Sequence, residues 1–193
     1  MQDFLFNMHL KTLAAIMAVC CAAWALFYTA ASVRKPKTKK PKIAALIFLL
    51  LWISFIVFIT LLSREQESVR RITTQPFGQI GTVFMNGNVL KEKSLNVMLF
   101  IPLGMFLASS FPRKMPEKSL AVLILSAALS CGIEYAQYKY MLGMADVDDI
   151  ICNAAGGFIG YIIYSISAVS IYVITQIRKN EKNSAQKQDT NNL

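Results

Sequence analysis

Apolar residues in this chain fall into long runs and do not alternate with polar ones. A bilayer-spanning helix needs about 20 mainly apolar residues, and the first, second and last runs are that long. The two central runs are shorter and contain polar residues. The pattern predicts an all-α polytopic membrane protein with five transmembrane helices. The predicted helices are Thr12–Val33, Ile43–Leu62, Leu95–Phe111, Leu120–Gln137 and Ile150–Ile177.

The composition divides the chain into three parts. Residues 1–42 contain the first predicted helix and a basic loop, and residues 43–177 form the main membrane domain. Residues 178–193 are rich in Asn, Gln and Lys without apolar periodicity, so we predict that this tail is disordered. The longest loop lies between the second and third helices, and its segment Gln79–Leu90 has turn residues that suit a small hairpin.

Basic residues are unevenly distributed between the predicted loops. The net charge is +9, and 13 of the 20 Lys and Arg residues lie in residues 34–42, 113–118 and 178–187. Cytoplasmic loops carry an excess of Lys and Arg, so this bias predicts an outer N-terminus and a cytoplasmic C-terminus. These charges flank apolar runs and form no patch with interleaved aromatic residues, so no nucleic-acid partner is expected.

Polar residues interrupt the last three apolar runs at a similar predicted depth. Carboxylates and amides are costly within or beside a bilayer, so they usually serve function or helix packing. Under the predicted topology they all lie toward the outer leaflet and converge on one outward-facing pocket. The candidate functional residues are Asn96, Glu134, Gln137, Asp146, Asp148, Asp149 and Asn153.

Several of these candidates have a structural alternative. Asp146 is a plausible N-cap of the last helix, with Asp149 at the third helical position. Glu134 is harder to explain as a cap, because it lies well inside its apolar run. Asn153 needs a hydrogen-bond partner, for which Glu134 or Gln137 is the natural candidate.

A second group of residues is expected to shape helix packing. Gly156 and Gly160 form a Gly-x-x-x-Gly motif, which allows two helices to approach closely. Pro102 removes one backbone donor inside the third helix and predicts a kink. The packing residues are Pro102, Gly104, Gly156, Gly157 and Gly160.

The sequence assigns no catalytic residues. It has one histidine and four cysteines without metal-ligand spacing, so a His-based phosphatase site or a Ser-His dyad is not expected. The main interpretation needs no cofactor. A metal site in this chain would use only oxygen ligands, which suit Mg²⁺ or Ca²⁺.

Four ordered stretches between residues 43 and 165 resemble the VanZ-like family of bacterial membrane proteins. The family often has an arginine shortly before the acidic run, where this chain reads Gly143-Met144-Ala145. The candidate substitutes for that arginine are Arg70, Arg71 and Lys139. The matching stretches are Leu61–Glu65 with Pro76-Phe77, Asn96–Gly104, Ser130–Gln137, and Asp146–Asn153 with Gly156, Gly157 and Gly160.

The resemblance implies a multi-pass protein of the bacterial plasma membrane with a role in teicoplanin-type glycopeptide resistance or in the cell envelope. Three hypotheses follow for the polar residues. In the first, they bind a membrane lipid, an envelope lipid precursor headgroup or a glycopeptide. In the second, Glu134, Asp148 and Asp149 hold Mg²⁺ or Ca²⁺ in an enzyme that acts on a lipid-linked substrate. In the third, they only cap and pack helices.

Overall fold

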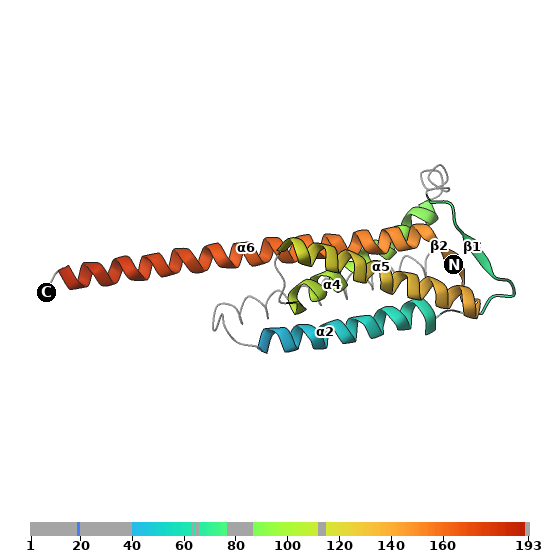
Figure 1. Cartoon of the computed structure of the whole chain (residues 1–193), viewed down its shortest axis with the longest axis horizontal. Helices are drawn as coiled ribbons and strands as arrows, with labels where there is room; N and C mark the ends of the chain where they lie inside the picture. The colour runs from blue at the N-terminus through green and yellow to red at the C-terminus, as the bar shows by residue number, and fades with distance from the viewer. Residues whose placement is uncertain are drawn as a thin grey trace.

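The computed structural model describes residues 19, 40–62, 64, 66–76, 87–111 and 115–191. Within these residues, four long helices run side by side and a small sheet lies at one end of the bundle (Figure 1). The helices are α2 (Lys40–Val57), α4 (Gly87–Ser110), α5 (Met115–Tyr140) and α6 (Val147–Asn191), and a π-helical turn, η1 (Phe58–Leu62), continues α2. The strands are β1 (Arg71–Thr73) and β2 (Met144–Asp146).

Each of the four helices contains a segment that is long and apolar enough to cross a membrane. The chain is therefore an all-α polytopic membrane protein, as predicted, and four of the five predicted helices are present. The first predicted helix, apart from Val19, and most of the predicted hairpin lie outside the described residues. The orientation of the termini stays a prediction. The spans are Ile43–Leu62, Glu92–Ser110, Glu117–Tyr140 and Val147–Glu181.

Helix α4 is the central helix of the described bundle. Of its span, 56% is buried inside the protein, against 17% for the span in α6. Phe106 of α4 packs against Phe48 and Trp52 of α2, with ring centroids 5.8 and 6.4 Å apart. The indole N–H of Trp52 also donates a hydrogen bond to the carbonyl of Leu99, at 2.9 Å. Because α4 contacts other helices over much of its surface, it needs a shorter continuous apolar run than a lipid-facing helix.

Glycines bring the backbones of α4 and α6 into direct contact. A Cβ atom placed on any of three of these glycines would overlap a backbone carbonyl of the facing helix. Gly157 also lies against Ser126 of α5, so all three helices meet at this level. Small residues therefore pack α4 against α6 in the way that the Gly-x-x-x-Gly motif predicts. The contacts are Gly104 with Gly157, Gly156 with Val97, and Gly160 with Ile101.

A buried lysine joins α5 and α6 at the end of the bundle away from the sheet. Lys118 donates a hydrogen bond to the hydroxyl of Tyr164, at 3.2 Å, and its Nζ lies 4.9 Å from the centroid of that ring. A desolvated cation over an aromatic face is stabilised by the ring quadrupole. The pair therefore ties α5 to α6 far from the sheet.

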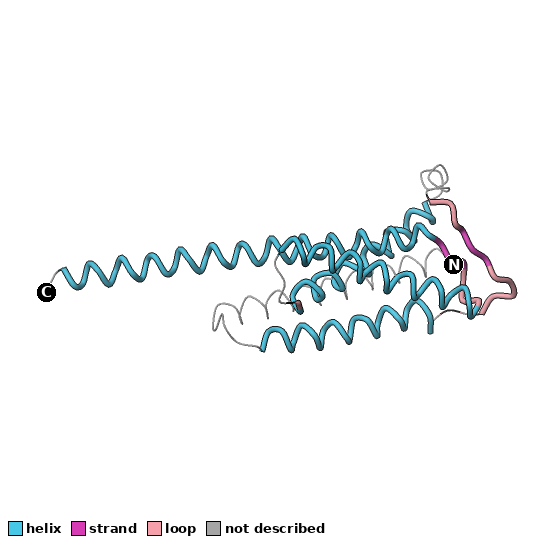
Figure 2. Tube along the Cα trace, viewed as in Figure 1, coloured by secondary structure: helices cyan, strands magenta, loops and turns pink. Residues whose placement is uncertain are grey.

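Helix α6 continues to Asn191, which differs from the disorder that we predicted for residues 178–193. The chain has no glycine or proline between Tyr161 and Asn191. Many residues of the tail are Lys, Arg, Glu, Gln and Ala, which are strong helix formers. The absence of apolar periodicity therefore reflects an exposed helix, which extends beyond the other helices (Figure 2).

The close contact between α4 and α6 predicts opposite effects for two glycine-to-alanine substitutions. Gly156→Ala places a methyl group against Val97, and we expect it to lower the free energy of unfolding by about 1–3 kcal/mol. The control is Gly132→Ala in α5, because no atom lies within 4 Å of the added Cβ. This variant should keep or raise stability, by up to about 1 kcal/mol. Unfolding of the purified full-length protein measures both, and equal stabilities would contradict the described packing.

Candidate functional site

Most of the polar residues predicted from the sequence lie where β1 and β2 pair, which we call the sheet end (Figure 1). The two strands are parallel, with Ile72 opposite Ala145 and Thr73 opposite Asp146. Strand β2 leads directly into α6, and α5 ends shortly before β2. The last turns of α5 and the first turns of α6 are therefore held together at the sheet end.

Lys93 of α4 binds two carboxylates of the β2–α6 segment. Its Nζ lies 2.6 Å from Oδ2 of Asp146 and 2.5 Å from Oδ1 of Asp149. The side chain of Lys93 is only 13% exposed, and those of Asp146 and Asp149 are 4% and 10% exposed. Removing one partner of such a buried group leaves an uncompensated charge, which is strongly destabilising. We call Lys93, Asp146 and Asp149 the ion cluster.

Asn96 and Glu134 complete the surroundings of the ion cluster. Asn96 lies one turn along α4 from Lys93, and its side chain hydrogen-bonds Asp149. Glu134 of α5 is buried, and its Oε2 accepts a hydrogen bond from the backbone N–H of Asp146, at 2.9 Å. Groups from α4, α5 and α6 thus meet around a single lysine.

Asp146 has a structural role in addition to its ion pair. Its Oδ1 accepts a hydrogen bond from the backbone N–H of Asp148, at 3.0 Å. Since α6 begins at Val147, Asp148 is the second helical residue and Asp146 occupies the N-cap position. This is the capping role that the sequence predicts. Asp148 itself is buried beside the cluster.

Gln137 and Asn153 are buried, but they have partners outside the ion cluster. The amide of Gln137 donates to the carbonyl of Thr60 at the end of η1, at 3.1 Å, where helix carbonyls lack backbone partners. Asn153 donates to Oγ of Ser130, at 2.8 Å, so the partner predicted from the sequence, Glu134 or Gln137, was wrong. Ser130 lies one helical turn from Glu134 and reaches Asn153 instead. Within the described part of the chain, Oδ1 of Asn153 is buried without a hydrogen-bond partner.

The polar residues form a closed cluster and do not line one open pocket, as we had expected. Asn96, Glu134, Asp146 and Asp149 surround Lys93, whereas Gln137 and Asn153 bind elsewhere. The sequence analysis counted Lys93 only as one basic residue on the predicted outer side. Its spacing of three residues from Asn96, which places both on one face of a helix, was the available signal.

The three predicted substitutes for the family arginine have partners of their own. The guanidinium of Arg70 lies 5.9 Å from the ring centroid of Tyr138. Arg71 forms an exposed ion pair with Glu67, which holds the pKa of the Glu67 carboxyl below its ordinary value. Lys139 lies 6.0 Å from the ring centroid of Tyr135. The charge that pairs with the acidic run is Lys93 instead.

Arg64 is a second basic residue near the acidic run that the sequence analysis did not consider. Gly143 is buried with a φ of 135°, and a Cβ atom there would lie 2.6 Å from Nη1 of Arg64. Arg64 is also close enough to Glu134 to interact with it electrostatically. Gly143 therefore accommodates both the backbone turn before β2 and the approach of this guanidinium.

A cleft of about 160 Å³ opens beside the ion cluster at the sheet end. Glu134 and Asp146 form part of its wall, and Tyr135 and Tyr138 extend α5 along one side. Both tyrosines are exposed, and Arg70 places a positive charge over the ring of Tyr138. The cleft thus combines accessible aromatic rings with a base of fixed polar groups. Other residues that line it are Ile72, Thr73, Val147 and Ile150.

The carboxylates that the metal hypothesis requires are engaged by groups of the protein. Lys93 lies between Asp146 and Asp149, and Glu134 accepts a backbone N–H. Among the residues that the structure describes, no three His, Cys, Asp or Glu side chains are grouped to hold a metal ion. The geometry therefore favours an ion-paired polar cluster at this site.

These features define a multi-pass membrane protein in which a buried lysine joins three helices at one end of the bundle. The chain belongs to the VanZ/LLP1 family, whose family model matches residues 44–168. This match confirms the resemblance found in the sequence. It includes every residue of the ion cluster, together with Asn96 and Glu134.

A curated relative supports the same assignment. The chain is similar to Protein VanZ of Enterococcus faecium, with 31% identity over 99 residues. That match covers 51% of this chain and 55% of the relative, so the chain spans about half the length of the curated protein it matches. No solved structure matches the chain.

The ion cluster predicts a large loss of stability when its lysine is replaced. In Lys93→Met, two buried carboxylates lose their counter-charge, and we expect the free energy of unfolding to fall by about 3–5 kcal/mol. The double variant Lys93→Met/Asp149→Asn should recover part of this loss. Arg71→Met is the control, because it breaks only an exposed ion pair and should cost less than about 1 kcal/mol. Denaturant unfolding of the full-length protein measures all three, and similar small losses would contradict a buried cluster.

Proposed function

We propose that this protein acts in the bacterial plasma membrane and contributes to glycopeptide resistance of the teicoplanin type. In this proposal, the cleft at the sheet end binds the headgroup of a membrane lipid or a lipid-linked envelope precursor. The bound headgroup would then be less accessible to a lipid-anchored glycopeptide. The observation that carries the proposal is the cleft whose wall includes Glu134 and Asp146, next to the ion cluster.

The composition of the cleft suits an amphipathic headgroup. Tyrosines are typical of the membrane–water interface, because the ring is apolar and the hydroxyl forms hydrogen bonds. Tyr135 and Tyr138 lie in the last turns of a membrane-spanning helix and are 64% and 38% exposed. Arg70, beside Tyr138, supplies a guanidinium of the kind that binds phosphate in bidentate fashion.

The ion cluster gives this cleft a rigid base. Glu134 is fixed by the backbone of Asp146, and Asp146 is fixed by Lys93 and by its own capping bond. Because these groups are ordered before a ligand arrives, binding does not require that they become ordered. The elements that form the cleft, β2, α5 and α6, are held in place by the same contacts.

The resistance proposal predicts a selective effect on one antibiotic. Expression in a teicoplanin-susceptible Gram-positive host should raise the minimum inhibitory concentration of teicoplanin more than that of vancomycin. Glu134→Gln keeps an oxygen acceptor for the N–H of Asp146 but removes the charge, so it should return the teicoplanin value to that of the empty vector. Cys131→Ser changes an exposed residue of α5 outside the cleft and should behave as wild type.

Two results would contradict this proposal. Equal teicoplanin values for the wild type and the empty vector would exclude the resistance role. If Glu134→Gln loses resistance only in proportion to a lower melting temperature, the polar residues serve packing and capping alone. A loss of resistance in a variant that melts normally supports a functional site.

The headgroup proposal also predicts phosphate recognition by Arg70. Butyl phosphate, which carries the headgroup chemistry on a short chain, should raise the melting temperature of the full-length protein in nanodiscs. Arg70→Gln should weaken this binding roughly tenfold, since a charged hydrogen bond contributes about 1.5–3 kcal/mol. Arg71→Gln is the matched control, because the neighbouring arginine pairs with Glu67. Equal binding by both variants would contradict the role of Arg70.

A further inference from the structure

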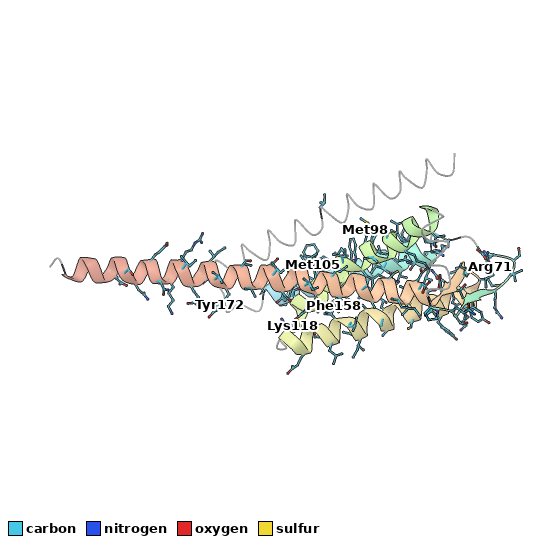
Figure 3. All side chains as sticks on the ribbon, turned by 90° about the horizontal axis from the view of Figure 1, so that it is seen from above. Arg71, Met98, Met105, Lys118, Phe158 and Tyr172 are labelled. Carbon is cyan, nitrogen blue, oxygen red and sulfur yellow. The ribbon has the colours of Figure 1, made fainter. Side chains whose placement is uncertain are left out.

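An apolar groove of about 500 Å³ runs between α5 and α6, next to the cleft. Ile150, in the first turns of α6, lines both the cleft and the groove. From there the groove follows α6 as far as Phe158 and faces Leu123 and Ala127 of α5. The two hollows therefore form one continuous path from the sheet end into the membrane-spanning part of the bundle. Phe158 is labelled in Figure 3, beside α5.

Small side chains create the groove. Its floor includes Ala127 of α5 and the neighbouring Ala154 and Ala155 of α6. The larger residues Leu123 and Phe158 stand beside them and are both about 40% exposed. Alanines between larger apolar residues leave a trough along the helix pair, because α5 and α6 cannot fill this space with their own side chains.

The groove lies at positions that the bilayer surrounds. Ala127 belongs to the span Glu117–Tyr140, and Ala154, Ala155 and Phe158 belong to the span Val147–Glu181. No charged residue lines the groove, whereas the adjoining cleft contains Glu134 and Asp146 and lies near Arg70. A polar opening that continues into an apolar trough matches the two parts of a lipid molecule.

We propose that this groove holds one hydrocarbon chain of the lipid whose phosphate headgroup occupies the cleft. The inference rests on the proposed function, and it adds the class of ligand, a phosphate-bearing membrane lipid held by its chain as well as by its headgroup. The continuity at Ile150 and the positive charge of Arg70 at the cleft favour this occupant over an uncharged apolar segment.

The contribution of the groove to binding is set by packing and shape. A lipid chain in the bilayer is already surrounded by apolar groups, so its transfer into the groove gains no hydrophobic free energy. The gain comes from the fit of the chain between Leu123, Phe158 and the alanine floor. We therefore expect a substitution that fills the groove to weaken binding several-fold.

A pair of matched alanine substitutions tests the groove in the full-length protein in phosphatidylcholine nanodiscs. Ala155→Phe fills the groove, and Ala128→Phe adds the same side chain to another exposed alanine that does not line it. The probes are butyl phosphate and octadecyl phosphate with a photoactivatable group in its chain. Ala155→Phe should weaken octadecyl phosphate binding about three- to tenfold and leave butyl phosphate binding unchanged. Ala128→Phe should leave both unchanged, and photolabel in the wild type should concentrate on residues 123–127 and 150–158.

The two proposals fail in different ways. If butyl phosphate does not bind, the headgroup proposal is wrong, whatever the labelling pattern. If butyl phosphate binds but both variants bind octadecyl phosphate equally, or the label spreads evenly over lipid-facing positions, the groove inference is wrong. A photo-crosslinker at position 155 that captures residues 12–33, or a second copy of the chain, would also overturn it.

Discussion

The position of one lysine, Lys93, determines how the helices of this protein meet. It lies in α4, the most buried helix, and binds carboxylates at the start of α6, where Asp146 also receives α5 through Glu134. The glycine contacts alone hold α4 against α6 without specifying which residues meet at the end. A charge that needs its partners specifies that register, because any other alignment leaves it buried and unpaired.

The helices and the depth of the polar residues could be predicted from the sequence, because both follow from the local order of apolar and polar positions. The N-cap role of Asp146 could also be predicted, since it depends on neighbours two residues away. The partners of Gln137 and Asn153 could not. Thr60 and Ser130 are distant along the chain, and which of several polar groups a side chain reaches depends on how the helices rotate about their axes.

The sheet end separates two kinds of polar environment over a short distance. The ion cluster is closed and saturated by groups of the protein, whereas the cleft beside it has exposed tyrosines and a nearby arginine. The first kind stabilises the bundle, and the second is accessible to a ligand. Glu134 and Asp146 belong to both, so stability and binding share residues here, and their effects must be separated by measuring each variant in both ways.

The length of α6 has a mechanical consequence. It is one uninterrupted helix of 45 residues, which at 1.5 Å per residue is roughly 68 Å long. Its first turn is anchored in the ion cluster, and its far end extends beyond the other described helices (Figure 2). A tilt of about 5° at the anchored turn displaces the far end by roughly 6 Å over that length. A small change at the sheet end would thus be amplified into a large movement at the opposite end of the molecule.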